Sequence, residues 1–275
     1  MKKIKTSALI GLGALGILFG RKMPGVQVIA DEDRIARYSA EPVVCNGEEC
    51  KFSYVTPAEG KPVDLLLVAV KATVLEQAIQ DIAKFVGPDT VILSVLNGIT
   101  SEEHIDAAYP GHTLWSVAIG MDATRTGRTL VFNQAGKIQF GERSGEMTDR
   151  VQAVADLFDG TGLHYQTTVH IREEIWSKFR LNVCNNLPQA ILGAGVGCYQ
   201  SSAHMKAISD GLCHELEAIA VAKGIDLSKV DASPRHGSLV PPATRYSTLQ
   251  DLDAGRHTEI DMFSGALMRM GQELG

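Results

Sequence analysis

Hydrophobic and polar positions form two different patterns along the chain. Up to about residue 168, apolar runs of five to seven residues are separated by glycines and charged segments. Such unbroken short runs predict strands buried on both faces of a parallel sheet. The clearest of them cover residues 5–10, 26–30, 64–70 and 91–96. From about residue 170 onward helical patterns dominate, so the chain is predicted to combine an α/β region with an all-helical one.

Between these regions, residues 112–142 contain strand-like segments at 114–121, 129–133 and 137–140, split by turn residues. They predict antiparallel additions to the sheet. An amphipathic helix is expected over 147–159 and a last short strand over 163–168. We therefore expect two domains, residues 1–168 and 169–275.

A glycine-rich turn follows the first predicted strand directly. Gly11, Gly13 and Gly16 form G-x-G-x-x-G, and an apolar helical stretch and a second strand come next. In this context the first glycine permits a tight turn, the second lets a pyrophosphate approach the backbone, and the third lets the helix pack on the sheet. The prediction is a Rossmann unit whose dinucleotide contacts the whole turn, and its cofactor-binding residues are Gly11, Leu12, Gly13, Ala14, Leu15 and Gly16.

These residues also allow two other interpretations. The glycines could serve a structural turn only. Alternatively, the lysines before the apolar run 8–20 resemble the start of a signal peptide. The run contains four glycines, leads into Arg21-Lys22 and has no small-x-small cleavage site, which favours the Rossmann interpretation.

Asp31 stands at the end of the second strand, twenty residues after Gly11. A carboxylate there accepts hydrogen bonds from an adenosine ribose and repels a 2′-phosphate, so it favours NAD over NADP. Arg34 could still reach such a phosphate, and a solvated turn residue is the alternative role for Asp31.

Polar residues also follow the third and fourth strands. Lys71 comes directly after the run 64–70, and Asn97-Gly98 ends the run 91–96. Ligands of open α/β sheets bind beyond the carboxyl ends of the strands. Lys71 and Asn97 are thus expected to face the site, although Asn97-Gly98 could be an ordinary turn.

In the helical half, Lys178, Asn182 and Asn186 recur every four residues amid apolar neighbours. On an α-helix this spacing places them on one face. Because asparagine is a weak helix former, a polar stripe lining a cleft is predicted, with a buried structural network as the alternative. Pro188 is expected to kink or end the helix. Near the end of the chain, His257 or Thr258 could start a helix with Glu259 and Asp261 in its first turn, where simple capping is the alternative role.

Charge and composition disfavour several classes of function. A formal charge of −6 disfavours sequence-independent nucleic-acid binding, and no apolar run is long enough to span a membrane. The five cysteines fit a reducing cytoplasm. Cys45 and Cys50 flank Asn46-Gly47, a hairpin signal, and could form a disulfide, although free thiols are favoured. The histidines have no metal-ligand spacing, so no metal site is predicted.

The combined motifs resemble the ketopantoate reductase (2-dehydropantoate 2-reductase) family, in the group with a 6-phosphogluconate-dehydrogenase-like C-terminal domain. They occur in that family's order: G-x-G-x-x-G at 11–16, Val70-Lys71, Leu96-Asn97-Gly98, Lys178-x3-Asn182-x3-Asn186, Ser247-x-Leu249-Gln250-Asp251 and Thr258-Glu259-Ile260-Asp261. The resemblance implies a Rossmann domain, a helical domain, an active site between them, NADP as cofactor and a possible homodimer.

The same resemblance implies a role for each site residue. Lys178 would be the general acid and Glu259 a second essential polar group, while Asn97, Asn182, Asn186 and Ser247 would hold the substrate. A lysine fits this chemistry because hydride delivery to a ketone leaves charge on oxygen that a donor must neutralise. Glu259 could orient that lysine or accept a hydrogen bond from a substrate hydroxyl.

Three features depart from the family's pattern. The family usually has a basic residue near the position of Asp31 that binds the 2′-phosphate of NADP. Asp31 therefore favours NAD, whereas the resemblance implies NADP. The glycine-rich segment 193–197 replaces a polar one, and the chain stops at Gly275 inside a helical pattern where relatives continue. We expect an NAD(P)H-dependent reductase of ketopantoate. The alternatives are an NADH-dependent reductase of another branched or aromatic 2-oxo acid and a nicotinamide-binding sensor without catalysis.

Overall fold

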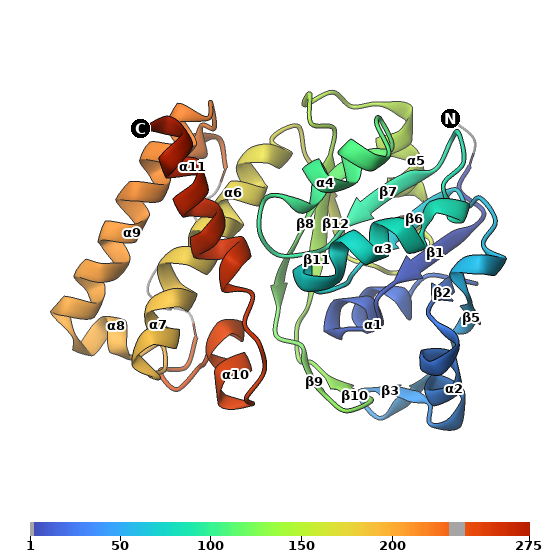
Figure 1. Ribbon diagram of the computed structural model, residues 1–275, viewed down its shortest axis with the longest axis horizontal. Helices are drawn as coiled ribbons and strands as arrows, with labels where there is room; N and C mark the ends of the chain where they lie inside the picture. The colour runs from blue at the N-terminus through green and yellow to red at the C-terminus, as the bar shows by residue number, and fades with distance from the viewer. Residues whose placement is uncertain (1–2, 231–239) are drawn as a thin grey trace. The chain divides into compact units, whose positions relative to one another are not determined.

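The computed structural model describes residues 3–230 and 240–275, within which the chain forms two compact units. The first runs up to Leu96 and continues over Thr100–Ile171. The second comprises Asn97–Ile99 and the chain from Arg172 onward. The first unit is α/β and the second is helical (Figure 1), as the sequence predicted.

The described part of the first unit is built on an eight-stranded sheet with the order β12-β11-β8-β7-β6-β1-β2-β5. Its strands are β1 (Ser7–Ile10), β2 (Gln27–Ile29), β5 (Ser53–Val55), β6 (Leu65–Val68), β7 (Val91–Ser94), β8 (Thr113–Met121), β11 (Ala135–Gly141) and β12 (Tyr165–Thr167). Six neighbouring strands are parallel, in the spatial order β5-β2-β1-β6-β7-β8, which is the strand order of a Rossmann sheet. The order reverses between β1 and β6. β11 adds antiparallel to β8, and β12 adds parallel to β11.

Both faces of this sheet are buried, which explains the unbroken apolar runs. Side chains alternate between the faces, so Leu9 and Leu67 belong to one hydrophobic cluster while Ala8 and Leu66 belong to the other. Helices α1 (Ala14–Gly20) and α5 (Asp149–Asp159) cover the first face, and α3 (Leu75–Asp81) and α4 (Ser101–Ala108) cover the second. Helix α2 (Glu32–Ala40) and the short turns η1 (Pro57–Glu59), η2 (Ala72–Val74) and η3 (Ala83–Phe85) complete the unit.

A second, four-stranded sheet was not foreseen. Its order is β4 (Glu48–Cys50), β3 (Val43–Cys45), β10 (Thr129–Val131) and β9 (Thr124–Thr126). The segment predicted to extend the main sheet at 129–133 was therefore misassigned, because β10 pairs with β3, which lies more than 80 residues earlier in the chain. Such long-range pairing leaves no local trace in the sequence.

The Asn46-Gly47 hairpin signal was correct. Both residues have positive φ, 49° and 84°, and they join β3 to β4. Cys45 pairs with Glu48 and Cys50 with Val43, so the two cysteines are diagonal neighbours rather than a directly opposed pair. Both are buried free thiols, and the disulfide alternative was wrong.

The second unit consists of helices packed around buried aromatic side chains such as Phe179 and Phe263, whose rings are 6.5 Å apart. Its described elements are α6 (Ile171–Leu181), which begins at the last residue of the first unit, η4 (Asn182–Asn186), α7 (Leu187–Leu192), α8 (Cys198–Ser201), α9 (Ala203–Ala222), η5 (Leu227–Lys229), α10 (Ser247–Asp253), η6 (Asp261–Gly265) and α11 (Ala266–Leu274). Two of these, η4 and η6, are π-helices that contact one another.

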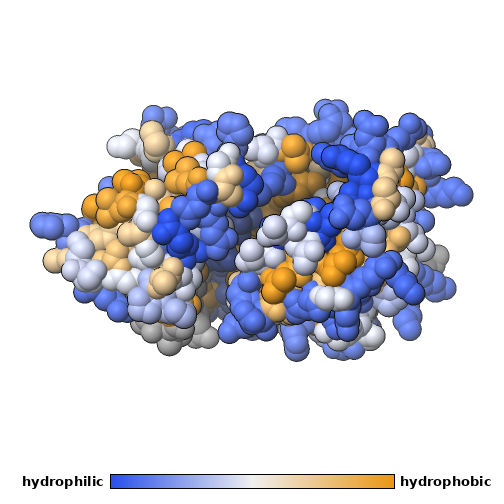
Figure 2. All heavy atoms as spheres, turned by 90° about the horizontal axis from the view of Figure 1, so that it is seen from below, coloured by the Kyte–Doolittle hydropathy of each residue, from blue (hydrophilic) through white to orange (hydrophobic). Residues whose placement is uncertain are grey.

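The face of the molecule in Figure 2 is largely hydrophilic, with hydrophobic groups scattered across it. Over the described ranges 3–230 and 240–275, no helix has the length and apolar character needed to cross a membrane.

Candidate active site

The glycine turn lies where the strand order reverses, between β1 and β6. Gly11 has φ +98°, and a Cβ there would lie 2.7 Å from the Ala69 carbonyl carbon and oxygen. At Gly16 a Cβ would come within 1.9 Å of the Gly11 carbonyl oxygen. The fold therefore requires glycine at both positions, as the motif predicted.

Gly13 is different, because no neighbouring atom of the described residues requires it to be glycine. Its φ of −75° and ψ of −168° are extended angles open to any residue. A Cβ there would find its nearest neighbour, the Ala69 oxygen, at 3.7 Å, an ordinary contact. A side chain would instead fill the space in front of the turn. This open cradle, with Leu12 before it and Ala14 and Leu15 opening α1, fits a dinucleotide whose pyrophosphate approaches the backbone.

Asp31 lies at the carboxyl end of β2 and is the N-cap of α2. Its Oδ1 accepts a hydrogen bond from the Arg34 backbone N–H at 2.7 Å, and its Oδ2 lies 3.4 Å from Arg34 Nε. More than half of each side chain is exposed. Asp31 is therefore a capping residue whose carboxylate remains accessible, with its charge partly offset by Arg34.

Lys71 and Asn97 lie at the same sheet edge, one after β6 and the other after β7. Lys71 is the exposed N-cap of η2, and Asn97 is half-buried. Gly98, with φ +88°, follows Asn97, and a Cβ on it would lie 3.6 Å from the Met262 carbonyl oxygen. The loop that holds Asn97 therefore packs on the π-helix η6. The contacted residue, Met262, is three residues after Glu259 in the chain.

Lys178 lies in the last two turns of α6 and is partly buried. Burial lowers the pKa of its ammonium group to about 8, because removing water penalises the charged form. A lysine in this range holds a proton at neutral pH and can also release it, as a general acid requires.

Asn182 and Asn186, in the segment after Lys178, form a linked polar group with Ser247 of α10. Asn186 Nδ2 lies 3.5 Å from both the Asn182 Oδ1 and the Ser247 Oγ. Both asparagines are only 5% exposed, and the Asn182 Nδ2 is buried without a hydrogen-bond partner in the described structure. An unpaired buried donor is costly, so this amide is available to a ligand.

The helix that carries these amides is not the regular α-helix that the spacing predicted. Residues 182–186 form a π-helix, and α7 then restarts with Pro188 in its first turn. The α-helix is thus interrupted, as Pro188 predicted, but by a wider turn that precedes the proline rather than by a simple kink. Single π turns of this kind occur frequently at functional sites.

The segment before α10, residues 242–246, is held by hydrogen bonds that its backbone N–H and C=O groups make. Gln189, fully buried, accepts a hydrogen bond from the Tyr246 N–H at 3.0 Å. The glycine-rich segment 193–197 pairs with residues 242–244, where a Cβ on Gly195 would lie 2.7 Å from the Pro242 carbonyl oxygen. These glycines therefore permit the close backbone approach that places Ser247.

Glu259 is half-buried and lies before the helix rather than in its first turn. The helical hydrogen bonding starts later than expected: η6 begins at Asp261, with Ile260 as N-cap and no side chain capping it. The prediction that His257 or Thr258 caps a helix containing Glu259 was wrong, whereas Asp261 lies in the first turn as predicted.

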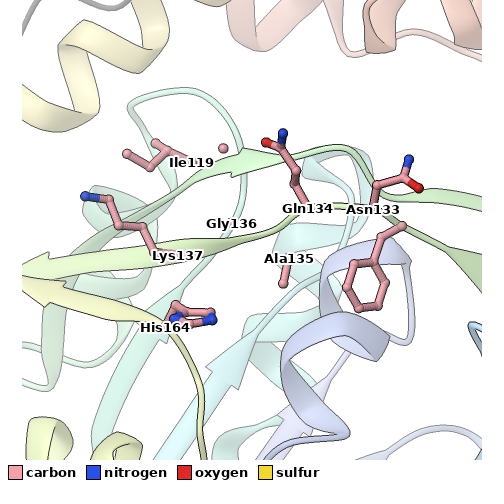
Figure 3. Close-up of a pocket in the computed structure, with 9 residues that line it drawn as sticks. Ile119, Asn133, Gln134, Ala135, Gly136, Lys137 and His164 are labelled. Atoms are coloured by element: carbon pink, nitrogen blue, oxygen red, sulfur yellow. The ribbon is translucent and has the colours of Figure 1, made fainter.

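Two features near the sheet edge were missed by sequence reasoning. A hollow of ≈ 590 Å³ lies beside the extended β8–β11 pair, with Gln134, Lys137 and His164 among its lining residues (Figure 3). Glu102, five residues after Asn97 in the chain, is 2% exposed and accepts a hydrogen bond from Ser101 Oγ at 2.9 Å. Burial raises the pKa of Glu102 to about 7. A charged residue in a polar run predicts exposure, so the sequence gives no sign that Glu102 is buried. The hollow is lined by residues from distant segments, which no local pattern connects.

Comparison with known proteins identifies the family of this chain. The family description "Ketopantoate reductase PanE/ApbA" matches residues 7–145, and "Ketopantoate reductase PanE/ApbA C terminal" matches residues 170–275. A 2-dehydropantoate 2-reductase of Streptococcus pyogenes serotype M18 is 27% identical, over 97% of this chain and 91% of its own.

Solved structures share the fold. A PanE/ApbA family ketopantoate reductase from Ralstonia eutropha JMP134 superposes with a TM-score of 0.83 at 23% identity, covering 98% of this chain and 93% of that one. A D-mandelate dehydrogenase solved with NADH and anilino(oxo)acetate gives a TM-score of 0.83 at 22% identity, with the same coverage. Because the two family descriptions together match most of the chain, this protein belongs to the ketopantoate reductase PanE/ApbA family of oxidoreductases.

Proposed function

We propose that this protein reduces 2-dehydropantoate to pantoate with NAD(P)H, a step toward pantothenate and coenzyme A. The observation that carries the proposal is a set of groups in the helical unit: a lysine with its pKa lowered to about 8, Asn182 and Asn186 four and eight residues after it, and Ser247 of α10 linked to Asn186. The relatives named 2-dehydropantoate 2-reductase support the choice of substrate.

Each residue has a role in the proposed reaction. The reduced nicotinamide supplies the hydride. Lys178 donates its proton to the carbonyl oxygen as negative charge develops there. Asn182, Asn186 and Ser247 bind the substrate carboxylate and hydroxyl as neutral donors and acceptors, which cannot compete for the proton. Asn97 binds the substrate from the β7 loop, and Glu259 orients Lys178 or accepts a substrate hydroxyl.

We assign cofactor binding to the first domain, residues 1–168, and substrate binding to the second, residues 169–275. The turn 11–16, Lys71 and Asn97 would contact the dinucleotide, and Asp31 its adenosine ribose. Asp31 favours NADH, while Arg34 offers a cation for the 2′-phosphate of NADPH. A homodimer and a cytoplasmic location remain predictions.

A second candidate is an NADH-dependent reductase of another branched or aromatic 2-oxo acid. It is favoured by the glycine-rich segment 193–197, which offers backbone contacts where the family has polar side chains. The shared fold of the D-mandelate dehydrogenase, solved with an aromatic 2-oxo acid derivative, is consistent with this candidate.

Steady-state assays with ketopantoate and with phenyl- and branched-chain 2-oxo acids, each with NADH and NADPH, test both candidates. We expect the highest kcat/KM for ketopantoate, and a lack of turnover with it would overturn the first candidate. Lys178→Ala should lower kcat roughly 10³-fold while the Kd for NAD(P)H changes little. Lys206→Ala is the matched control, because Lys206 is a surface lysine paired with Asp210 at 2.6 Å.

A further inference from the structure

An arginine outside every motif discussed above contacts the centre of the glycine turn. Arg125 lies on β9, and its Nη1 donates a hydrogen bond to the carbonyl oxygen of Leu12, 113 residues away in the chain. Its Nε donates to the Gly127 carbonyl oxygen at 2.9 Å. These two bonds fix the plane and position of a partly buried guanidinium beside the turn.

This cation has no acidic partner among the described residues. Its hydrogen bonds go to two carbonyl oxygens, and the charged or ionisable groups that act on it are Tyr38 and Arg128. Arg128 is itself paired with Glu41, at 3.1 Å. Burial lowers the pKa of Arg125, which shows that part of its hydration is lost without a compensating anion.

The guanidinium also has unused donors. Arginine carries five N–H groups in a planar fork, and two of them are occupied by the carbonyls of Leu12 and Gly127. The others remain for an oxyanion, and such a fork matches the geometry of a phosphate. Partial burial without a counter-charge is costly unless an anion completes the site.

We propose that Arg125 binds the diphosphate of the nicotinamide dinucleotide. This rests on the proposed use of NAD(P)H. It adds a charged side chain to a turn whose other phosphate donors are backbone N–H groups. Of the phosphates in the cofactor, the diphosphate is the one concerned, because Leu12 lies between Gly11 and the open cradle at Gly13. The 2′-phosphate would instead lie by Asp31 and Arg34, on the far side of the adenosine ribose.

The competing role for Arg125 is a brace that ties the β9–β10 hairpin to the turn. R125Q separates the roles, since it removes the charge and the fork, while the glutamine amide N–H takes the place of the arginine Nε–H and can still donate to the Gly127 carbonyl oxygen. The matched control is R128Q, which removes a neighbouring guanidinium that pairs with Glu41 and stacks on Tyr38. Binding of NADH, NADPH and ADP-ribose to each protein is measured by titration calorimetry, together with the melting temperature.

For R125Q we expect the Kd of all three ligands to rise by a common factor of about ten or more, with R128Q within about twofold of wild type. A lower melting temperature with unchanged Kd values would show a brace and overturn the proposal. A loss confined to NADPH would assign Arg125 to the 2′-phosphate and overturn it as well. Failure of the wild-type protein to bind any of the ligands would instead refute the proposed function, and this inference with it.

Discussion

The glycine turn after β1 and the π-helical segment after α6 show two ways of building a site. In the turn, close approach of the backbone to itself decides which residue types fit, since a Cβ at Gly16 would lie 1.9 Å from the Gly11 carbonyl oxygen. In the π segment, side chains determine the site, through 3.5 Å contacts among Asn182, Asn186 and Ser247. Substitutions in the turn should therefore act mainly through folding and cofactor binding, and those in the π segment through substrate chemistry.

The largest effect is expected for Gly16→Ala, which forces the new methyl group against the Gly11 carbonyl. Because neither atom belongs to a flexible side chain, the backbone of β1 or α1 must shift. We expect a loss of roughly 3 kcal/mol or more in the free energy of unfolding, measured by urea denaturation. A variant as stable as wild type would show that the turn is not packed as described.

In the π segment, Asn186→Leu removes the amide that joins Asn182 to Ser247 and keeps the number of side-chain heavy atoms. We expect kcat/KM for the 2-oxo acid to fall between about 10- and 100-fold, with an unchanged Kd for NAD(P)H. The measurement is steady-state kinetics beside a cofactor titration.

Asn185→Leu is the control for that variant. Asn185 lies in the same π-helix and is fully buried, but neither polar atom of its side chain has a partner in the described structure. Its replacement should leave kcat/KM within about twofold and stabilise the fold by about 1 kcal/mol. Equal losses of activity in both variants would mean that the π-helix matters as a whole and that the Asn182–Asn186–Ser247 group has no special role.

A smaller and more selective effect is expected for Gly13→Ala. The new methyl group meets no protein atom closer than 3.7 Å, so the free energy of unfolding should change by less than about 1 kcal/mol. The Kd for NADH should nevertheless rise about tenfold or more, because the methyl group occupies the space in front of the turn. Unchanged cofactor binding would refute the assignment of that space to the dinucleotide.

The two regions also differ in how much of them could be predicted. Gly11 and Gly16 were identifiable because a local steric need produces a local motif. The recurrence of Lys178, Asn182 and Asn186 identified the polar stripe, but the periodicity assumed a regular α-helix. Five successive residues in π conformation give no separate pattern, because an i, i+4 pair stays near one face in either helix type.

Contacts between distant segments were not predictable. The pairing of β10 with β3 and the bond from Arg125 to Leu12 join residues more than 80 positions apart, and neither leaves a periodic signal. The role expected for Glu259 came from the family resemblance and stays a prediction, while its local structure was wrongly predicted as the first turn of a helix.

The pH dependence of kcat/KM for ketopantoate reduction tests the central assignment most directly. In the proposed mechanism Lys178 donates a proton, and it is protonated below its pKa of about 8. The profile should therefore be level below that pH and fall about tenfold per pH unit above it. A profile that stays level from pH 7 to well above 9, or no ketopantoate reduction at any pH, would contradict the assignment of Lys178 as the general acid.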